Sequence, residues 1–246
     1  MIPDICGMHI LLIAATTFEI QPTIEFLDKK GLAAPLPSGT PIHPRAPLTV
    51  TSLITGVGSI ATTWSLMHQI RGGRPDLIIQ AGIAGCFAGM GKKHGEVVVI
   101  REEQLADLGV WEEQRFKTLF DLKLAGDDTF PFSGGKLINP YRRLLALTGL
   151  DAVTAITVNE ITTDPVRIAW YQQNIPAVVE SMEGGGLHYA CLQEKIPFIQ
   201  LRSISNEIGV RDKTKWEIRS AIANLNEQLI SLLEKLKGVE RTVLEP

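Results

Sequence analysis

Short apolar runs, each bounded by Gly, Pro or Asp, recur along the whole chain and alternate with amphipathic segments. An apolar run of four to eight residues between turn residues is typical of a buried strand, and apolar residues at helical spacing predict a helix. We expect strands at residues 8–15, 48–54, 77–81, 96–100, 152–158, 177–179 and 198–201. We expect helices at residues 22–30, 59–70, 140–148, 164–173, 184–195 and 215–236. This alternation predicts an α/β fold whose largely parallel sheet is covered by helices on both faces.

Two long segments interrupt this pattern. Residues 35–47 contain five prolines, and residues 101–135 mix acidic clusters with phenylalanines. Irregular segments of this length in a compact protein are usually binding lids or contact elements, and we expect a lid or a dimer contact rather than a linker. With 246 residues, 45% of them hydrophobic, the chain can bury one substantial core. We therefore expect one domain over residues 1–246.

Charge and cysteine content narrow the class of partner. The formal net charge is −3, so no basic surface supports binding to nucleic acid or to an anionic membrane. The apolar stretch at residues 10–15 is too short to cross a bilayer, and no basic leader precedes it. Cys6, Cys86 and Cys191 show no paired spacing, and the five histidines show no metal-ligand pattern. We expect a cytoplasmic protein that binds a small molecule and needs neither a metal nor a cofactor.

Polar residues that follow the expected strands are the candidates for a site, because ligands of open parallel sheets bind beyond the carboxyl ends of the strands. Glu19 follows the first strand, Glu183 follows the strand at 177–179, and Asn206 follows the last strand. Each also has a structural interpretation. Glu19 could stabilise the start of a helix through the helix dipole, Glu183 could cap a helix, and Asn206 could be a turn residue.

Glycines lie beside two of these places. Residues 80–85 are expected to form a turn of small residues, and Ala84 and Gly85 would let a ligand approach the backbone closely. Three glycines at 184–186 open the helix after Glu183. Each destabilises a helix by about 1 kcal/mol relative to alanine, which indicates a packing or functional demand at this helix start.

Two motifs resemble a known family. Ser181-Met182-Glu183-Gly184 resembles the ribose motif of the purine nucleoside phosphorylase and nucleosidase family, and residues 202–206, Arg-Ser-Ile-Ser-Asn, resemble its base motif. The resemblance implies a three-layer α/β/α fold with a central mixed sheet. It also implies that Glu183 binds the ribose hydroxyls, that Met182 lies beneath the sugar and that Glu19 activates water. The nucleosidases of this family are usually homodimers, so we expect a homodimer.

Hydrolysis and phosphorolysis place different demands on the site. Phosphate is a dianion near neutral pH, so a phosphorylase needs fixed cations and convergent N–H donors. The phosphorylase branch has an Arg and a Ser where this chain has Gln80 and Ile83. Glu19 would repel phosphate and is suited to act as a general base for water. The residues therefore favour a hydrolase.

Asn206 bears on which base is released. The methylthioadenosine and S-adenosylhomocysteine nucleosidases resembled here have Asp at this place. The two N–H donors of an amide match N7 and O6 of a 6-oxopurine such as hypoxanthine, although a flipped amide could still serve adenine. We expect Ile161, which follows the strand at 152–158, to be the apolar contact of the base.

The stretches 106–110 and 120–122, together with Asn206, look like the futalosine hydrolase branch of the family. That resemblance implies release of hypoxanthine from futalosine, in menaquinone biosynthesis. The carboxyphenyl-ketone arm on the 5′ side of futalosine would need aromatics and a cation, and Arg115, Phe116 and Phe120 are candidates. Two alternatives stay open: an adenine-releasing thionucleoside nucleosidase, and a protein of the same fold that binds or stores nucleosides without turnover.

Overall fold

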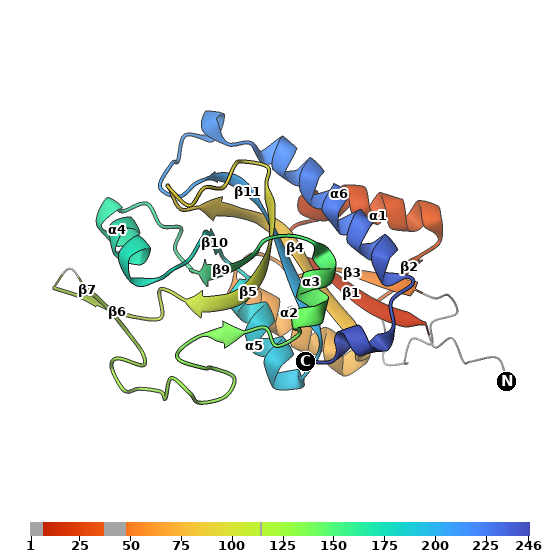
Figure 1. Ribbon diagram of the computed structural model, residues 1–246, viewed down its shortest axis with the longest axis horizontal. Coiled ribbons are helices and arrows are strands. Elements are labelled where there is room, and N and C mark those ends of the chain that lie inside the picture. The colour runs from red at the N-terminus through yellow and green to blue at the C-terminus, as the bar shows by residue number, and fades with distance from the viewer. Residues whose placement is uncertain (1–6, 37–47, 114) are drawn as a thin grey trace.

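The computed structural model describes residues 7–36, 48–113 and 115–246 (Figure 1). The strands are β1 (Met8–Ala14), β2 (Ala33–Ala34), β3 (Leu48–Ile54), β4 (Leu77–Cys86), β5 (Val97–Leu105), β6 (Gly109–Glu112), β7 (Arg115–Thr118), β8 (Leu137–Ile138), β9 (Ala152–Thr157), β10 (Val179–Ser181) and β11 (Phe198–Glu207). The α-helices are α1 (Thr17–Lys30), α2 (Ser59–Gly72), α3 (Arg142–Thr148), α4 (Pro165–Asn174), α5 (Gly184–Glu194) and α6 (Ile218–Leu236).

The described strands form one mixed sheet and a separate hairpin. The sheet has the order β10-β9-β5-β11-β4-β1-β3-β2, with the short β8 paired to β5. Most pairs are parallel, whereas β11 with β5, β8 with β5, and β10 with β4 are antiparallel. Because β10 pairs with both β9 and β4, this side of the sheet curls until it closes on itself. The hairpin consists of β6 and β7.

Helices cover both faces of the sheet. Helices α1, α3 and α6 lie on one face, and α2 and α5 pack together on the other (Figure 1). All seven residues of β1 are buried, and α6 presents a stripe of buried leucines to the sheet. The expected α/β/α arrangement around a mixed sheet is therefore confirmed.

Three strands run further than the sequence predicts. The segment 80–85, expected as a turn, belongs to β4, and residues 202–206 belong to β11. These two strands continue because they pair with each other as far as Cys86 and Glu207. The strand β5 also extends, to Leu105, although charged residues follow Ile100. The site residues on β4 and β11 therefore lie on strands rather than in the loops after them.

The structure tests only one of the two long segments that were expected to be irregular. Most of residues 35–47 lies outside the described residues. In residues 101–135, the prediction of an irregular segment is wrong for the end of β5 and for the hairpin of β6 and β7. Here Phe116 is buried and packs against Trp111 and Trp170, which ties the hairpin to α4.

Helices α1 and α6 do not begin where the sequence predicts. Helix α1 begins at Thr17, because Thr16 and Glu19 form a capping box that outweighs the proline inside the helix. Helix α6 begins at Ile218, so Trp216 lies before the helix and not on its buried stripe.

An amide from α6 repairs the disruption in α1. Pro22 has no N–H, and its ring crowds the preceding turn. The Thr23 N–H and the Glu19 carbonyl, which bond each other in a regular helix, both bond Asn226. The Asn226 Oδ1 accepts from the Thr23 nitrogen at 3.1 Å, and its Nδ2 donates to the Glu19 oxygen at 2.9 Å. Asn226 is 2% exposed, so the last α-helix holds the backbone of Glu19 from within the core.

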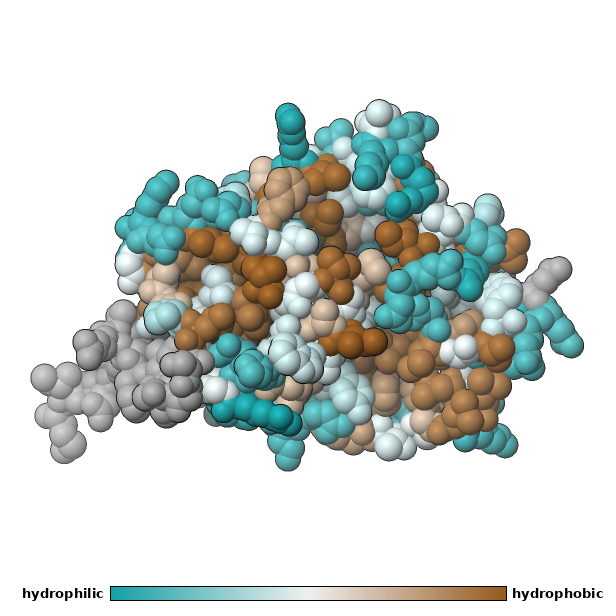
Figure 2. Space-filling view, turned by 180° about the vertical axis from the view of Figure 1, so that it is seen from behind, coloured by the Kyte–Doolittle hydropathy of each residue, from teal (hydrophilic) through white to brown (hydrophobic). Residues whose placement is uncertain are grey.

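The outer face of α2 is apolar and exposed. Ile60 is 82% exposed and Trp64 is 67% exposed, and Val57, just before the helix, is 58% exposed. Figure 2 shows the molecule from behind, with apolar side chains reaching the surface over much of that side. Contiguous exposed apolar surface on a helix is typical of a protein contact.

Candidate active site

A cavity of about 270 Å³ lies where β1, β4, β10 and β11 approach one another. All seven residues predicted from the sequence line this one cavity. They are Glu19, Ala84, Gly85, Ile161, Met182, Glu183 and Asn206. Residues far apart in the chain are thus brought together at the edge of the sheet that the strand topology predicts.

Glu183 occupies the N-cap position of α5, but its side chain makes no capping hydrogen bond. Its Oε1 accepts instead from the backbone N–H of Gly58 at 3.2 Å, and its Oε2 pairs with the Arg202 guanidinium at 3.1 Å. Gly58 has φ of 95°, a left-handed conformation that glycine adopts readily, and it precedes the positive end of α2. The helix-cap interpretation of the Glu183 carboxylate is therefore wrong.

Arg202 is buried and connects three parts of the site. Its Nη1 pairs with Glu183 and donates to the Ile83 carbonyl at 3.3 Å, and its Nη2 donates to Oε1 of Gln80 at 3.0 Å. A guanidinium suits this task because its donors are fixed in one plane. Arg202 thereby joins β11, β4 and the start of α5.

Glu19 bonds the same residue of β4 as Arg202 does, Ile83, but through the backbone N–H of that residue. Its Oε2 accepts from the nitrogen and the hydroxyl of Thr16, and its Oε1 accepts from the Ile83 N–H at 3.1 Å. Glu19 therefore both stabilises the start of α1 and lines the cavity. A Cβ on Gly82 would lie 2.6 Å from Nη1 of Arg202 and 2.9 Å from Oε1 of Glu19. Only glycine at this position leaves room for both charged groups.

Close packing explains the three glycines after Glu183. A Cβ on Gly184 would overlap the carboxylate of Glu103 and the amide of Gln200. A Cβ on Gly185 would overlap Leu105, and one on Gly186 would lie 2.7 Å from a backbone oxygen of α2. The helix start is thus pressed against its neighbours, which supplies the packing demand that the sequence indicated.

A layer of buried polar groups lies behind this helix start. Burial raises the pKa of Glu103 to about 7, with the Thr157 hydrogen bond and the Arg202 charge opposing it. Burial lowers the pKa of His188 to about 4, although the ring bonds the Leu137 carbonyl. Among the described residues, Oε2 of Glu103, Nε2 of His188 and both side-chain polar atoms of Gln200 find no hydrogen-bond partner. Such groups lower stability and are kept where a site requires them.

Asn206 sits beside a bulge in β11. The register between β11 and β4 shifts between Ile204 and Asn206, and a bulge of this kind redirects side chains. The Oδ1 of Asn206 accepts from the Ser205 hydroxyl at 2.8 Å, and its Nδ2 donates to the Glu207 carbonyl at 3.0 Å. A flipped amide would turn Oδ1 toward the Glu207 carbonyl, two acceptors face to face. One N–H of Asn206 therefore stays free of these bonds.

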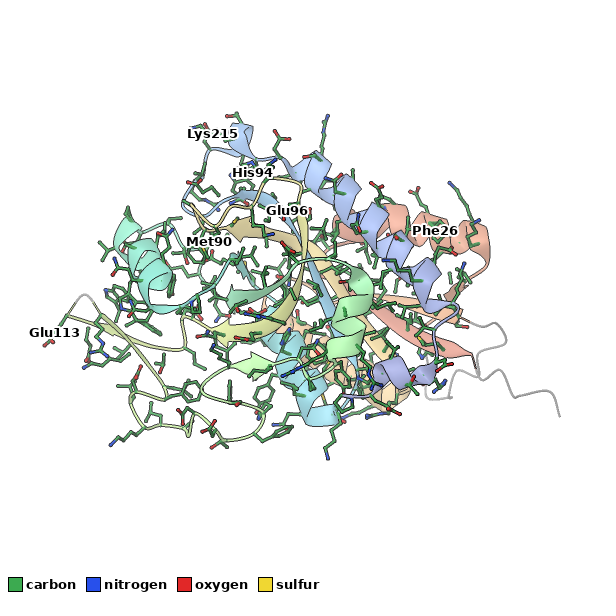
Figure 3. All side chains as sticks on the ribbon, viewed as in Figure 1. Phe26, Met90, His94, Glu96, Glu113 and Lys215 are labelled. Atoms are coloured by element: carbon green, nitrogen blue, oxygen red, sulfur yellow. The ribbon has the colours of Figure 1, made fainter. Side chains whose placement is uncertain are left out.

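Several cavity residues were not predicted from the sequence. They include Phe18, Val57, Thr162, Glu180, Arg211 and Trp216. Arg211 stacks over the Trp216 ring at 5.4 Å, and the Trp216 Nε1 donates to the Val210 carbonyl. Trp216 falls within the segment 215–236 that the sequence predicts as a helix, whereas in the structure it lies before α6. Figure 3 places Lys215, its neighbour, at the same edge of the molecule as His94.

The residues considered for the 5′ arm lie elsewhere. Arg115, Phe116 and Phe120 line a separate hollow with Trp170 and not the cavity of Glu183. Within one copy of the chain, their position corrects that interpretation. The hairpin of β6 and β7 carries Arg115 and Phe116 toward α4, and Phe120 packs against Phe132.

Other sequence-based expectations concern cysteines, metals and membranes. Cys86 and Cys191 are free and buried, and Cys6 lies outside the described residues. Within the described ranges, no group of three or more His, Cys, Asp or Glu side chains could hold a metal ion. Over those same ranges, no helix has both the length and the apolar character that crossing a membrane requires.

Three relatives match three quarters or more of the chain. The futalosine hydrolase of Streptomyces coelicolor is 31% identical over 244 residues, which is 95% of this chain and 100% of that protein. The futalosine hydrolase of Thermus thermophilus is 28% identical, over 77% of this chain and 83% of that protein. The 5′-methylthioadenosine/S-adenosylhomocysteine nucleosidase of Pseudoalteromonas translucida is 27% identical, over 78% of this chain and 82% of that protein. No protein-family model matches the chain.

Solved structures agree on the fold. The methylthioadenosine/S-adenosylhomocysteine nucleosidase of Colwellia psychrerythraea, in complex with adenine, superposes with a TM-score of 0.72 at 21% identity. The match covers 95% of this chain and 98% of that one. Fold and relatives together define an N-glycosyl hydrolase that acts on nucleosides. Within that class, the chain belongs to the futalosine hydrolase family.

The buried carboxyl of Glu103 should make stability depend on pH. An unfolded chain ionises this group near 4.5 and the folded protein near 7, so the native state holds an extra proton between these values. The contribution is full below pH 4.5 and is lost as the pH rises to 7. The isosteric Glu103→Gln removes the titrating proton. It should gain up to about 3 kcal/mol of stability over its parent between pH 4.5 and pH 8.

Chemical denaturation of both proteins across this range measures the difference. The surface variant Glu227→Gln on α6 is the matched control and should follow the parent. If the curves of Glu103→Gln and the parent stay parallel, the Glu103 carboxyl has the same pKa in the folded and the unfolded chain.

Proposed function

We propose that this protein hydrolyses the N-ribosidic bond of futalosine and releases hypoxanthine, a step of menaquinone biosynthesis. The observation that carries the proposal is the 31% identity to a futalosine hydrolase along the whole length of that relative. The amide of Asn206 in the cavity fits this base, because one of its N–H groups can donate to N7 of hypoxanthine. The same proposal places the enzyme in the cytoplasm. The free thiols of Cys86 and Cys191 support that location, and cell fractionation is the direct check.

The sugar is held from the side of Glu183. Its carboxylate accepts hydrogen bonds from the 2′ and 3′ hydroxyls, while Arg202 and the Gly58 N–H fix its orientation. Met182, next in the chain, contacts the sugar from beneath. The bare backbone at Ala84 and Gly85 leaves room for the ligand, and Ile161, 45% exposed, forms the apolar wall for the base.

Bond cleavage needs charge stabilisation at both ends. The bond from C1′ to N9 breaks, its electron pair stays on the purine, and positive charge develops on the sugar near Glu183. The free N–H of Asn206 donates to N7 and stabilises the negative charge, since an amide cannot supply a proton. A single preorganised contact of this kind contributes about 3 kcal/mol. Glu19 takes a proton from water as the water oxygen bonds C1′.

The geometry of Asn206 limits its contact with the base. With one N–H bonded to the Glu207 carbonyl, a single N–H remains for the purine. Asn206 thus serves N7, and the two-donor match to N7 and O6 expected from the sequence is reduced to one.

The pair of Arg211 and Trp216 is suited to the 5′ arm of futalosine. Both residues line the cavity, and Arg211 lies over the indole ring. An aromatic ring and a cation at one rim complement a carboxyphenyl group. The methylthio group of methylthioadenosine has no charge for this arginine to bind.

A second candidate function is hydrolysis of methylthioadenosine or S-adenosylhomocysteine. The 27% identity to a nucleosidase for these substrates favours it. The alternative of nucleoside binding or storage without turnover does not fit the named relatives, which are a futalosine hydrolase and a nucleosidase.

A four-substrate assay tests the proposal. Incubation with futalosine, inosine, methylthioadenosine and aminodeoxyfutalosine, with and without phosphate, is followed by chromatography of the released base. We expect hypoxanthine from futalosine without phosphate. Glu19→Gln should slow this release about a hundredfold to ten-thousandfold, whereas the exposed Glu25→Gln on the same helix should not. A requirement for phosphate would contradict hydrolysis, and a tenfold preference for methylthioadenosine would contradict futalosine as the substrate. Unchanged rates in Glu19→Gln would contradict Glu19 as the general base.

Removal of the Arg211 cation at the rim of the cavity should weaken binding only of substrates that carry the acidic 5′ arm. In Arg211→Gln the KM for futalosine should rise about fivefold to tenfold, because a partly exposed ion pair is lost. The KM for inosine, which has no arm, should stay within twofold. Steady-state kinetics measure both, with Arg219→Gln on the exposed side of α6 as control. Equal changes for the two substrates would mean that Arg211 does not contact the arm.

We also propose a homodimer that uses the outer face of α2. Val57 lines the cavity and is contiguous with the exposed Ile60 and Trp64, so a second copy would cover apolar surface beside the site. Light scattering should give a dimer for the parent and a monomer for Trp64→Glu. A monomeric parent, or a dimeric Trp64→Glu, would place the contact elsewhere.

A further inference from the structure

A row of buried polar side chains crosses the sheet beneath the start of α5. Glu103 of β5 and Gln200 of β11 both reach the place that a Cβ on Gly184 would take, so their ends face each other. His188 lies one turn further along α5 and is 0% exposed. Burial raises the pKa of Glu103 and lowers that of His188, and in both the Gln200 amide opposes the shift. The amide therefore lies between the carboxyl and the ring.

With the amide in its present orientation, this row contains four unpaired atoms. Among the described residues, Oε2 of Glu103, both polar atoms of Gln200 and Nε2 of His188 find no hydrogen-bond partner. Each such buried atom lowers stability. The oxygen and the nitrogen of an amide have nearly the same shape, so the donors and acceptors around them decide which is which.

The fixed partners of the two outer residues show where the protons lie. Nδ1 of His188 is 3.1 Å from the Leu137 carbonyl, which only accepts, so Nδ1 carries a hydrogen. Burial lowers the pKa of His188 to about 4, so near neutral pH its Nε2 is a lone pair that needs a donor. Oε1 of Glu103 accepts from the Thr157 hydroxyl at 2.7 Å, and burial raises the pKa of this carboxyl to about 7. Below that pH the proton lies on Oε2, which needs an acceptor.

We propose that Glu103, Gln200 and His188 form one neutral hydrogen-bonded row, with the Gln200 amide turned over, and that this row positions the start of α5. Oε2–H of Glu103 then donates to Oε1 of Gln200, and Nε2–H of Gln200 donates to Nε2 of His188. The four unpaired atoms satisfy one another. The present orientation of the amide would instead need a carboxylate and an imidazolium, two charged forms that burial disfavours.

The surrounding charges leave this neutral state in place. The groups that face Glu103 are Arg202 on β11, Glu183 at the start of α5, His188 across the amide, Thr157 on β9 and Leu137 on β8. Arg202 and Glu183 bond each other, and their charges act in opposite directions on the pKa of Glu103, where burial is the largest effect.

The row is tied to the helix that begins at Glu183. The Thr157 hydroxyl accepts from the Gly185 N–H at 2.7 Å and donates its own hydrogen to Glu103. This N–H belongs to the first turn of α5, which the Glu183 side chain does not cap, and His188 follows in the second turn. None of the three residues of the row lines the cavity, so they are positioning residues. The inference rests on the proposed role of Glu183 in holding the sugar.

Ionisation of Glu103 breaks the row. A carboxylate at this position draws the NH₂ of Gln200 to itself, so the amide turns its oxygen toward the lone pair of His188. The neutral form is lost as the pH rises through about 7. The KM for the nucleoside should therefore rise about threefold to tenfold between about pH 6 and about pH 8, with a smaller change in kcat, because one hydrogen bond behind the sugar site is lost.

An isosteric variant separates positioning from bulk structure. In Glu103→Gln the new amide accepts from Thr157 and donates to Gln200, so the row persists at every pH. We expect its KM to keep the low-pH value up to about pH 8, whereas Glu103→Leu should have a KM about threefold to tenfold higher at every pH. The control Glu227→Gln on α6 should follow the parent. The kinetics use futalosine, or whichever of the four nucleosides the parent cleaves.

Two spectra report the protons directly and need no turnover. The difference infrared spectrum between the parent and Glu103→Gln should show the stretch of a protonated carboxyl at about pH 6, and this band should fade by about pH 8. Nitrogen NMR of histidine-labelled protein should show a neutral His188 ring with its hydrogen on Nδ1. The signal is assigned by its loss in His188→Gln.

Three results would count against these proposals in different ways. An ionised Glu103 or an imidazolium at His188 at about pH 6 would overturn the neutral row. A KM that rises with pH equally in the parent and in Glu103→Gln, or in neither, would overturn the positioning role. A parent that cleaves none of the four nucleosides would instead contradict the proposed function, while the two spectra would still test the row.

Discussion

The buried ion pair between Arg202 and Glu183 is the interaction on which the site depends. Both side chains are almost fully buried, at 2% and 8% exposed, so each charge needs the other. Arg202 also bonds Gln80 and the Ile83 carbonyl, and the N–H of the same Ile83 bonds Glu19. Two carboxylates far apart in the chain are thereby held beside one residue of β4, Glu19 directly and Glu183 through Arg202. Loss of either member of the pair would leave an uncompensated buried charge and release the other groups.

The curl of the sheet determines what lies beside this pair. Because β10 pairs with both β9 and β4, the strand that leads into Glu183 is carried back against Gly85. The same closure presses the start of α5 against Glu103 and Gln200, which is why residue 184 must be glycine. A flat sheet would leave Glu180 and Asn206 on separate surfaces. The cavity is therefore a product of strand pairing as much as of the loops.

The sequence predicts the parts of the fold and of the site that local patterns carry. Alternating apolar runs predicted the layers, and two short motifs predicted Glu183 and Asn206, because the chemistry of those positions is local to the motif. The end of β5 was missed because charged residues normally end a strand, whereas Glu103 is buried by tertiary contacts. Glu180 carried no signal, since its position depends on pairing with a strand almost a hundred residues away.

Trp216 and the small residues of β4 show the same limit. A tryptophan at helical spacing predicts a buried helix face, yet the chain turns two residues before α6 begins. The sequence at 80–85 looks like a turn because Gly and Ala are small, although β11 holds it as a strand. In both places a partner distant in the sequence decides the local conformation, and no single-chain pattern records that partner.

The amide of Asn226 has a consequence for how the protein matures. Asn226 follows Glu19 by 207 positions and replaces the backbone bonds that Pro22 disturbs. During synthesis on the ribosome, the first turn of α1 emerges early, but its repair waits until almost the entire chain has left the exit tunnel. Before then, the Glu19 carbonyl lacks its hydrogen bond to Asn226. A nascent chain that already contains the motifs for sugar and base therefore still lacks this support, and the backbone at Glu19 is completed only together with α6.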